Sequence, residues 1–365
     1  MIYIQRINAI YRFMVDGKPI SFTGVHNYHL NDDISGGADF PDWNDNWGRF
    51  DSVKCDAYFK YLSDNNFNFI RFQMNLAGVY YSQTYRDLLE QIATIGQRHG
   101  VYILYVVAGL NRPIQGRECF SWRNEGQPYT PYVQTWEELN TTELYNSAIL
   151  MLATLCQRHS NVMIGNWNEP IDGGWAEFNI DSWNNYLSNL RYTLTLIRNS
   201  GYTGVIIIML GVALWENEGT PRDTLLTAIE ENMDLFTDYG SVALDFHYYW
   251  ILMYPYHPPT YSEIPAYFDR IGVKEVMTRL KLCCFESGLI TSKGMLTEQL
   301  NAQELILKYF SENGVDWTIH TGQPLDESAI YDVKLLLNDA GRIALKWARY
   351  VQQSKAIYSY GTIIL

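Results

Sequence analysis

Residues 141–167 read TTELYNSAILMLATLCQRHSNVMIGNW, and this stretch holds the unit that decides the fold. Residues 141–160 carry apolar side chains such as Leu144, Leu152 and Leu155 at the three- and four-residue spacing of an amphipathic helix. The run Val162–Trp167 that follows is almost continuously apolar, as expected of a parallel strand buried on both faces. The stretch therefore predicts a helix that leads into a buried strand.

The same alternation recurs along the whole chain. Further helical stretches are Ser82–Gly100 and Asp181–Gly201. The strand-like runs are Ile20–Val25, Phe67–Phe72, Val101–Val107, Val162–Trp167, Val205–Leu210, Val242–Phe246, Leu282–Phe285 and Val315–Ile319. Eight strands that alternate with helices predict an α/β fold, a single (β/α)₈ TIM barrel over residues 1–365. A doubly wound open sheet is the alternative, but neither a GxGxxG nor a P-loop pattern supports it.

Long loops are expected on one face of this barrel. They span Asn27–Phe50, Gly109–Asn140 and Tyr248–Phe268, and each of them follows a predicted strand. In a (β/α)₈ barrel the segments that follow the strands form the catalytic face. We therefore expect the functional site at that face.

Composition restricts the class of partner. The net charge of −13 disfavours nucleic acid and anionic membranes, and no apolar stretch is long enough to span a bilayer. Aromatic residues make up 15% of the chain, which suits a protein that stacks rings on sugars. The five cysteines follow no metal-binding or disulfide-rich spacing and are expected to be mostly buried thiols. The N-terminus lacks a signal-peptide core, so both an intracellular protein and a secreted one whose signal was omitted stay open.

Two carboxylates stand where buried strands open onto the expected catalytic face. Glu169 ends the sequence Ile164-Gly165-Asn166-Trp167-Asn168-Glu169-Pro170, and Glu286 lies in Phe285-Glu286-Ser287-Gly288. A carboxylate next to a buried strand is costly unless it is paired or used in chemistry. Two of them across a barrel suit glycoside hydrolysis, which needs a proton donor and a second carboxylate.

The order of these residues resembles clan A of the glycoside hydrolases, and family five is the most similar. The resemblance comprises Asn168-Glu169-Pro170 after the fourth strand, Glu286 after the seventh, Arg71 in the second and His247-Tyr248-Tyr249 after the sixth. Val15-Asp16-Gly17-Lys18-Pro19 and Phe22-Thr23-Gly24-Val25-His26-Asn27 are similar to that family's first strand, particularly in its mannanases. It spans nearly the whole chain.

The resemblance implies a role for each matching residue. Glu169 would be the acid/base and Glu286 the nucleophile of a retaining enzyme. Arg71 and Tyr249 would hold Glu286 as the anion, Asn168 would bind the 2-hydroxyl of the sugar, and His247 would support the acid/base.

The sequence departs from the family at two strands. The third strand ends at Ala108 where the family usually has a His. In the eighth strand Trp317 falls inside the strand and His320 takes the position of the usual platform Trp, although Trp317 would serve in another register.

Other residues are weaker candidates. His26 or Asn27 is expected to line the sugar site. A metal site of His26, His29, Asp32 and Asp33 is the alternative, but the spacing of these residues matches no established metal signature. Further sugar platforms could come from tryptophans on the loops after strands, namely Trp122, Trp175, Trp215 and Trp250.

The sequence thus predicts a retaining endo-acting β-glycoside hydrolase that acts on a β-1,4-linked glucan or mannan. It is expected to be a monomer and to need no metal or organic cofactor. A carbohydrate-binding pseudoenzyme and an exo-acting β-glycosidase stay open as alternatives.

Overall fold

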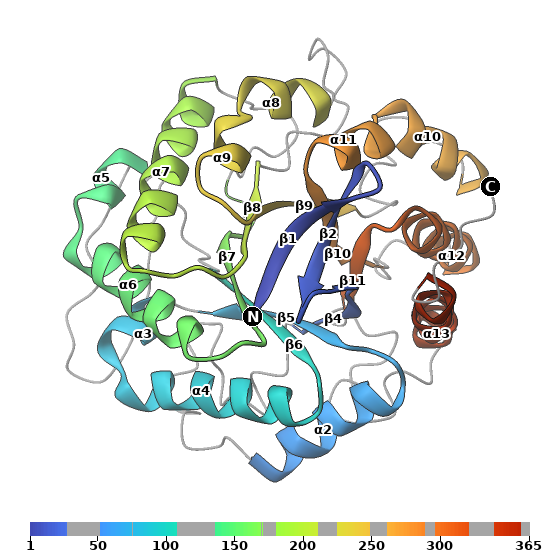
Figure 1. Ribbon diagram of the computed structural model, residues 1–365, viewed down its shortest axis with the longest axis horizontal. Coiled ribbons are helices and arrows are strands. Elements are labelled where there is room, and N and C mark those ends of the chain that lie inside the picture. Colours follow the sequence, from blue (N-terminus) through green and yellow to red (C-terminus); the bar gives the residue numbers. More distant parts are fainter. Residues whose placement is uncertain are drawn as a thin grey trace.

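The computed structural model describes residues 1–27, 52–74, 76–107, 136–168, 170, 180–210, 225–248, 261–288, 296–320 and 339–358. Eight parallel strands close into a barrel in the order β10-β11-β4-β5-β6-β7-β8-β9 (Figure 1). Their bounds are β4 Thr23–Asn27, β5 Phe69–Met74, β6 Tyr102–Val107, β7 Val162–Trp167, β8 Ile206–Met209, β9 Val242–Tyr248, β10 Lys281–Ser287 and β11 Asp316–His320. The predicted TIM barrel is confirmed, and the open sheet is excluded by the closure of β10 and β4 through β11.

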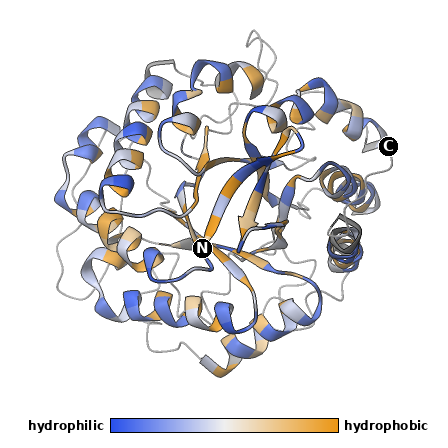
Figure 2. Cartoon of the chain, viewed as in Figure 1, coloured by the Kyte–Doolittle hydropathy of each residue, from blue (hydrophilic) through white to orange (hydrophobic). Residues whose placement is uncertain are grey.

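Helices form a ring outside the barrel (Figure 1). Those of the described residues are α2 Ser52–Asp64, α3 Leu76–Tyr81, α4 Gln83–Arg98, α5 Trp136–Asn140, α6 Glu143–Gln157, α7 Ile180–Asn199, α8 Leu225–Glu231, α9 Asp234–Thr237, η5 Tyr261–Glu263, α10 Ile264–Arg270, α11 Val273–Arg279, α12 Leu296–Asn313 and α13 Asp339–Tyr358. Apolar colour concentrates in the strands and polar colour on the outer surfaces of the helices (Figure 2). None of the helices in the described residues is both long and apolar enough to cross a membrane.

Alternation along each strand divides the apolar residues into two cores. In β5, Phe69 lies in the cluster inside the barrel, whereas Ile70 and Phe72 belong to the cluster between the strands and the helices. In β8, Ile207 faces inward and its neighbours face the helices. This alternation decides which polar residue of a strand can reach the barrel interior.

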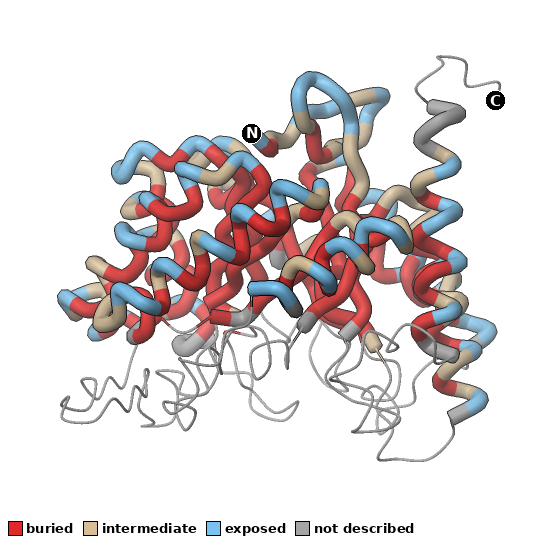
Figure 3. Tube along the Cα trace, turned by 90° about the horizontal axis from the view of Figure 1, so that it is seen from below, coloured by how far each residue is buried: buried red, intermediate tan, exposed pale blue. Residues whose placement is uncertain are grey.

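The N-terminal residues form a small antiparallel sheet that the sequence analysis did not identify. It consists of β1 Ile2–Ile7, β2 Ile10–Val15 and β3 Lys18–Ile20. Ile2 and Phe13 of this sheet join Phe22 and Phe69 in the inner cluster. The hairpin lies across one end of the barrel (Figures 1 and 3). It therefore closes the amino end, opposite the end where strands such as β5 and β10 bring their polar residues.

The described cysteines are Cys55, Cys156, Cys283 and Cys284, and all four are buried and form no disulfide. Burial raises the pKa of the Cys156 thiol above its usual range, so it stays protonated. These four residues behave as expected, as apolar core side chains. Cys119 lies outside the described residues.

Candidate active site

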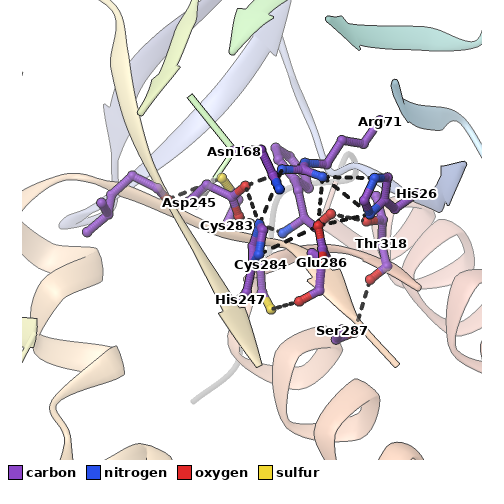
Figure 4. A network of polar contacts seen from close by, with 12 residues as sticks. His26, Arg71, Asn168, Asp245, His247, Cys283, Cys284, Glu286, Ser287 and Thr318 are labelled. Atoms are coloured by element: carbon purple, nitrogen blue, oxygen red, sulfur yellow. Dashed lines mark hydrogen bonds and ion pairs between the residues drawn. The ribbon is translucent and has the colours of Figure 1, made fainter. Parts of the chain in front are cut away.

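Five strands bring polar side chains together at the carboxyl end of the barrel. They are His26 on β4, Arg71 on β5, Asn168 after β7, His247 on β9 and Glu286 on β10. Their side chains point toward one another (Figure 4). All except Asn168 are buried. Each of these residues was predicted from the sequence as a site residue, and the structure brings them into one cluster.

Arg71 lies at the centre of the cluster. Its Nη1 donates to Glu286 Oε2 at 2.8 Å, and its Nη2 donates to Asn168 Oδ1. The side chain is fully buried, which is tolerated because a carboxylate and several acceptors surround the guanidinium. The planar fork of Arg71 thus fixes the positions of Glu286 and Asn168 relative to each other.

His26 supplies a second contact to the same carboxylate. Its Nδ1 lies 3.0 Å from Glu286 Oε2, and its Nε2 lies 3.0 Å from Arg71 Nη1. A neutral imidazole protonated at Nδ1 fits both neighbours, because Nδ1–H donates to the carboxylate while Nε2 accepts from the guanidinium. His26 is fully buried, and its described contacts are with Glu286 and Arg71.

His247 lies on the other side of Arg71. Its Nε2 is 3.3 Å from Arg71 Nη2 and 3.6 Å from Asp245 Oδ2, and its Nδ1 is 3.5 Å from Glu286 Oε2. We expected this ring to support the acid/base. Its described contacts are instead with Glu286 and the residues that hold Glu286.

These neighbours determine the ionisation of Glu286. Burial would raise the pKa of its carboxyl. The positive charges that His247 and His26 acquire in acid, the hydrogen bond from His26 and the Arg71 guanidinium outweigh that effect, and the pKa lies well below its usual range. Glu286 is therefore a carboxylate at any ordinary working pH, which is the form that a nucleophile requires.

Asp245 belongs to the same cluster and was not predicted from the sequence. It lies two residues before His247 on β9, is 2% exposed, and its Oδ2 is 3.9 Å from Arg71 Nε. The available signal was an acidic residue in an otherwise apolar strand, because such a residue must find a buried partner.

Trp317 lies inside β11, as the first interpretation of the sequence had it, and its alternative role as a sugar platform is not supported. The residue is fully buried in the cluster between strands and helices, and its Nε1 donates to Ser311 Oγ of α12 at 3.1 Å. The alternation of β11 turns this ring away from the barrel interior, so it cannot serve as a sugar platform.

Several other candidates lie outside the described residues. They are Glu169, Tyr249, Trp122, Trp175, Trp215 and Trp250, together with Ala108, His29, Asp32 and Asp33. Asn27 and His320 are described only as backbone, at the ends of β4 and β11. Within the described part of the chain, no group of three or more His, Cys, Asp and Glu residues is arranged to hold a metal ion.

The sequence matches the model of a known protein family. A family model described as cellulase (glycosyl hydrolase family 5) matches residues 16–324. No curated protein matches the sequence.

The solved structures with a similar fold include several cellulases. The catalytic domain of the major endoglucanase from Xanthomonas campestris pv. campestris has a TM-score of 0.63 at 14% identity, over 96% of this chain and 100% of that chain. An endocellulase variant from Pyrococcus horikoshii in complex with cellotetraose has a TM-score of 0.63 at 13% identity, over 96% of this chain and 98% of that chain. A thermostable, halotolerant family 5 cellulase from an Icelandic hot spring isolate has a TM-score of 0.54 at 13% identity, over 87% of this chain and 80% of that chain. At such identities the likeness establishes the fold alone.

Proposed function

Because the chain belongs to glycosyl hydrolase family 5, the cellulase family, we propose that it is a retaining, endo-acting hydrolase of β-1,4-linked glucans. The observation that carries the proposal is the state of Glu286. This carboxylate is buried at the carboxyl end of the barrel, where His247, His26 and Arg71 keep its pKa well below the usual range, and the contacts of Arg71 and His26 orient it. We propose residues 1–365 as one catalytic domain, since the described elements surround a single barrel.

The proposed reaction proceeds in two displacements. Glu286 attacks the anomeric carbon while Glu169 gives its proton to the leaving glycosidic oxygen, and a glycosyl-enzyme ester forms. Glu169 then removes a proton from water, which attacks the same carbon and releases Glu286. The role of Glu169 rests on its place in the sequence after β7, directly beside Asn168.

Asn168 is the proposed contact for the sugar's 2-hydroxyl. Arg71 donates to its Oδ1, and its Nδ2 amide group would be the donor to the sugar. A hydrogen bond to the 2-hydroxyl strengthens as charge develops at the anomeric centre, so this contact assists the transition state.

The choice of glucan follows the names of the similar structures, which are endocellulases and an endoglucanase. A β-1,4-mannan is the second candidate, because the first strand resembles that of mannanases. The prediction of endo action is based on the same similar structures, which are named as an endocellulase and an endoglucanase.

The first test compares wild type with Glu286→Gln on soluble cellulose, mixed-linkage glucan and mannan. We expect wild type to cleave one of them with retention at the anomeric carbon. The rate of Glu286→Gln should fall by roughly 10⁴- to 10⁶-fold, the range for the loss of a covalent nucleophile. Glu90→Gln is the matched control, because Glu90 pairs with Arg158 on the outer surface, and its rate should equal that of wild type.

A mechanism-based fluoro-sugar separates the enzyme from a carbohydrate-binding pseudoenzyme. Covalent labelling of Glu286 with loss of the fluoride leaving group supports the proposal. Binding without labelling, or equal rates for wild type and Glu286→Gln, contradicts it.

A further inference from the structure

The strand that carries Glu286 contains one residue more than its neighbours. On the β9 side, Cys283 pairs with Asp245 and the next pair is Glu286 with His247. On the β11 side, Cys284 pairs with Trp317 and the next pair is Ser287 with Ile319. In both registers three steps on β10 oppose two on the partner, which defines a β-bulge around Phe285.

The bulge decides which way Glu286 faces. Without the extra residue, Glu286 would stand beside Tyr248, which packs in the cluster between strands and helices. With it, Glu286 stands beside His247, and its side chain reaches Arg71 inside the barrel. A shift of one residue reverses the face of every later side chain, so the bulge is a condition for the site.

Two side chains from the neighbouring strands satisfy the backbone of the bulged residue. The Phe285 N–H donates to Asp245 Oδ1 at 2.7 Å, and the Thr318 hydroxyl donates to the Phe285 carbonyl. Asp245 and Thr318 are 2% and 0% exposed. A bulge removes ladder partners from its extra residue, and an unpaired buried N–H or C=O is costly. These two side chains therefore stabilise the bulged register over the regular one.

We propose that Asp245 and Thr318 are positioning residues that clamp this bulge and thereby set where the Glu286 carboxylate lies during attack. Asp245 also connects the bulge to the other groups around the nucleophile, because its Oδ2 is 3.6 Å from His247 Nε2. The inference rests on the proposed function, since it assigns these residues a part in aiming the nucleophile. Neither residue touches the reacting atoms.

The decisive variant is Thr318→Val, which removes the hydroxyl and preserves the shape. We expect kcat on an aryl β-cellobioside to fall by roughly 10²-fold, the cost of a small misplacement of a reacting group, with KM little changed. Thr318→Ser restores the hydroxyl and should recover most of kcat. Asp245→Asn, which keeps the acceptor for Phe285, should lose less than Asp245→Ala.

Thr23→Val is the matched control. Thr23 is also a buried barrel threonine whose hydroxyl donates to a backbone carbonyl, that of Asn66 at 3.3 Å, but no bulge adjoins it. Its kcat should stay near that of wild type. Equal losses in Thr23→Val and Thr318→Val would overturn the clamp.

Azide rescue tests whether Thr318 acts by positioning the Glu286 carboxylate or by stabilising the active site as a whole. In Glu286→Gly, azide attacks the anomeric carbon, the aryloxide leaves, and an inverted glycosyl azide forms. Adding Thr318→Val should leave this azide-dependent rate unchanged, because there is no carboxylate to aim. A further loss of about the same size as in the Glu286 enzyme would overturn the inference. If wild type is neither active nor labelled by the fluoro-sugar, the proposed function fails, and the clamp fails with it.

Discussion

Strand β10 carries a buried charge at each end of the barrel, and the two are built differently. At the amino end Lys281 forms an ion pair with Asp316, and both residues are 2% exposed. Lys281 Nζ also donates to the Gly314 carbonyl at 3.3 Å and lies 5.0 Å from the Phe13 ring, while Asp316 accepts from the Phe22 N–H. At the carboxyl end, Glu286 lies within reach of Arg71, His26 and His247.

The difference separates a structural pair from the proposed catalytic cluster. Lys281 and Asp316 match one charge with one charge and find their other partners in the backbone and in an aromatic ring of the hairpin. Around Glu286, three nitrogen-bearing side chains converge on one carboxylate and keep it ionised. A pair of the first kind only has to avoid an unpaired buried charge, whereas the second favours one particular protonation state. Mutations at the two ends should therefore affect different observables.

Among the variants that test this difference, the largest expected effect is on stability at the amino end. Lys281→Met leaves Asp316 buried without its counter-charge and should lower the free energy of unfolding by about 3–5 kcal/mol. The kcat of the folded protein should be unchanged, because the carboxyl end is intact. Urea unfolding and initial rates measure the two quantities. Lys281→Met with Asp316→Asn removes both charges and should recover much of the loss; a double variant as unstable as the single one contradicts the ion-pair explanation.

Arg71→Lys should produce the reverse pattern. Lys keeps the charge but loses the fork that contacts Glu286 and Asn168 together. We expect kcat/KM to fall by roughly 10²-fold, or about 2.7 kcal/mol at 1.36 kcal/mol per factor of ten, with a smaller change in stability than Lys281→Met causes.

Arg191→Lys is the control for that change. Arg191 makes a two-pronged contact with Asp234 in the helix layer, at 2.6 and 2.9 Å, far from the barrel interior. Arg191→Lys also loses a two-pronged guanidinium contact, but Arg191 contacts none of the proposed catalytic residues, so kcat/KM should not change. A comparable loss of rate in both variants would mean that Arg71 acts only through general stability.

The barrel could be predicted because its strands are buried on both faces and therefore appear as apolar runs. The run Val162–Trp167 agrees with β7 at both ends, and β9 extends only two residues beyond Val242–Phe246. The hairpin of β1 and β2 was missed, although residues 1–17 alternate polar and apolar side chains. That alternation marks a strand with one exposed face, whose apolar side chains here close the amino end.

The site could be predicted in its parts but not in its register. Arg71 lies within β5, and His247 and Glu286 lie near the ends of β9 and β10; all three are polar residues that interrupt apolar runs. The bulge in Cys283-Cys284-Phe285 leaves no such mark, because all three residues are apolar and the extra one looks like any other. Asp245 contacts Phe285 forty positions away in the chain, so only the fold brings them together. The role of Trp317 stayed open between two registers for the same reason, since one step of register decides whether its ring faces the barrel interior or the helices.

The smallest expected effect concerns the pH dependence of the cluster around Glu286. In His26→Phe the ring shape is kept, but the hydrogen bond and the charge that lower the pKa of Glu286 are lost. That pKa should rise, so the acidic limb of the kcat/KM profile should move to higher pH while the rate at neutral pH changes little. The native pKa is depressed, so Glu286 contributes stability that is present above its unfolded pKa and lost as pH falls through its folded pKa. His26→Phe raises the folded pKa of Glu286 and therefore narrows the pH range, between its folded and unfolded pKa values, over which this stability is lost.

His99→Phe is the control, because His99 pairs with Asp56 at 2.9 Å in the helix layer. The acidic limb of its kcat/KM profile should coincide with that of wild type. If His26→Phe leaves the limb in place, His26 does not hold the carboxylate, and Arg71 with His247 must account for its ionised state.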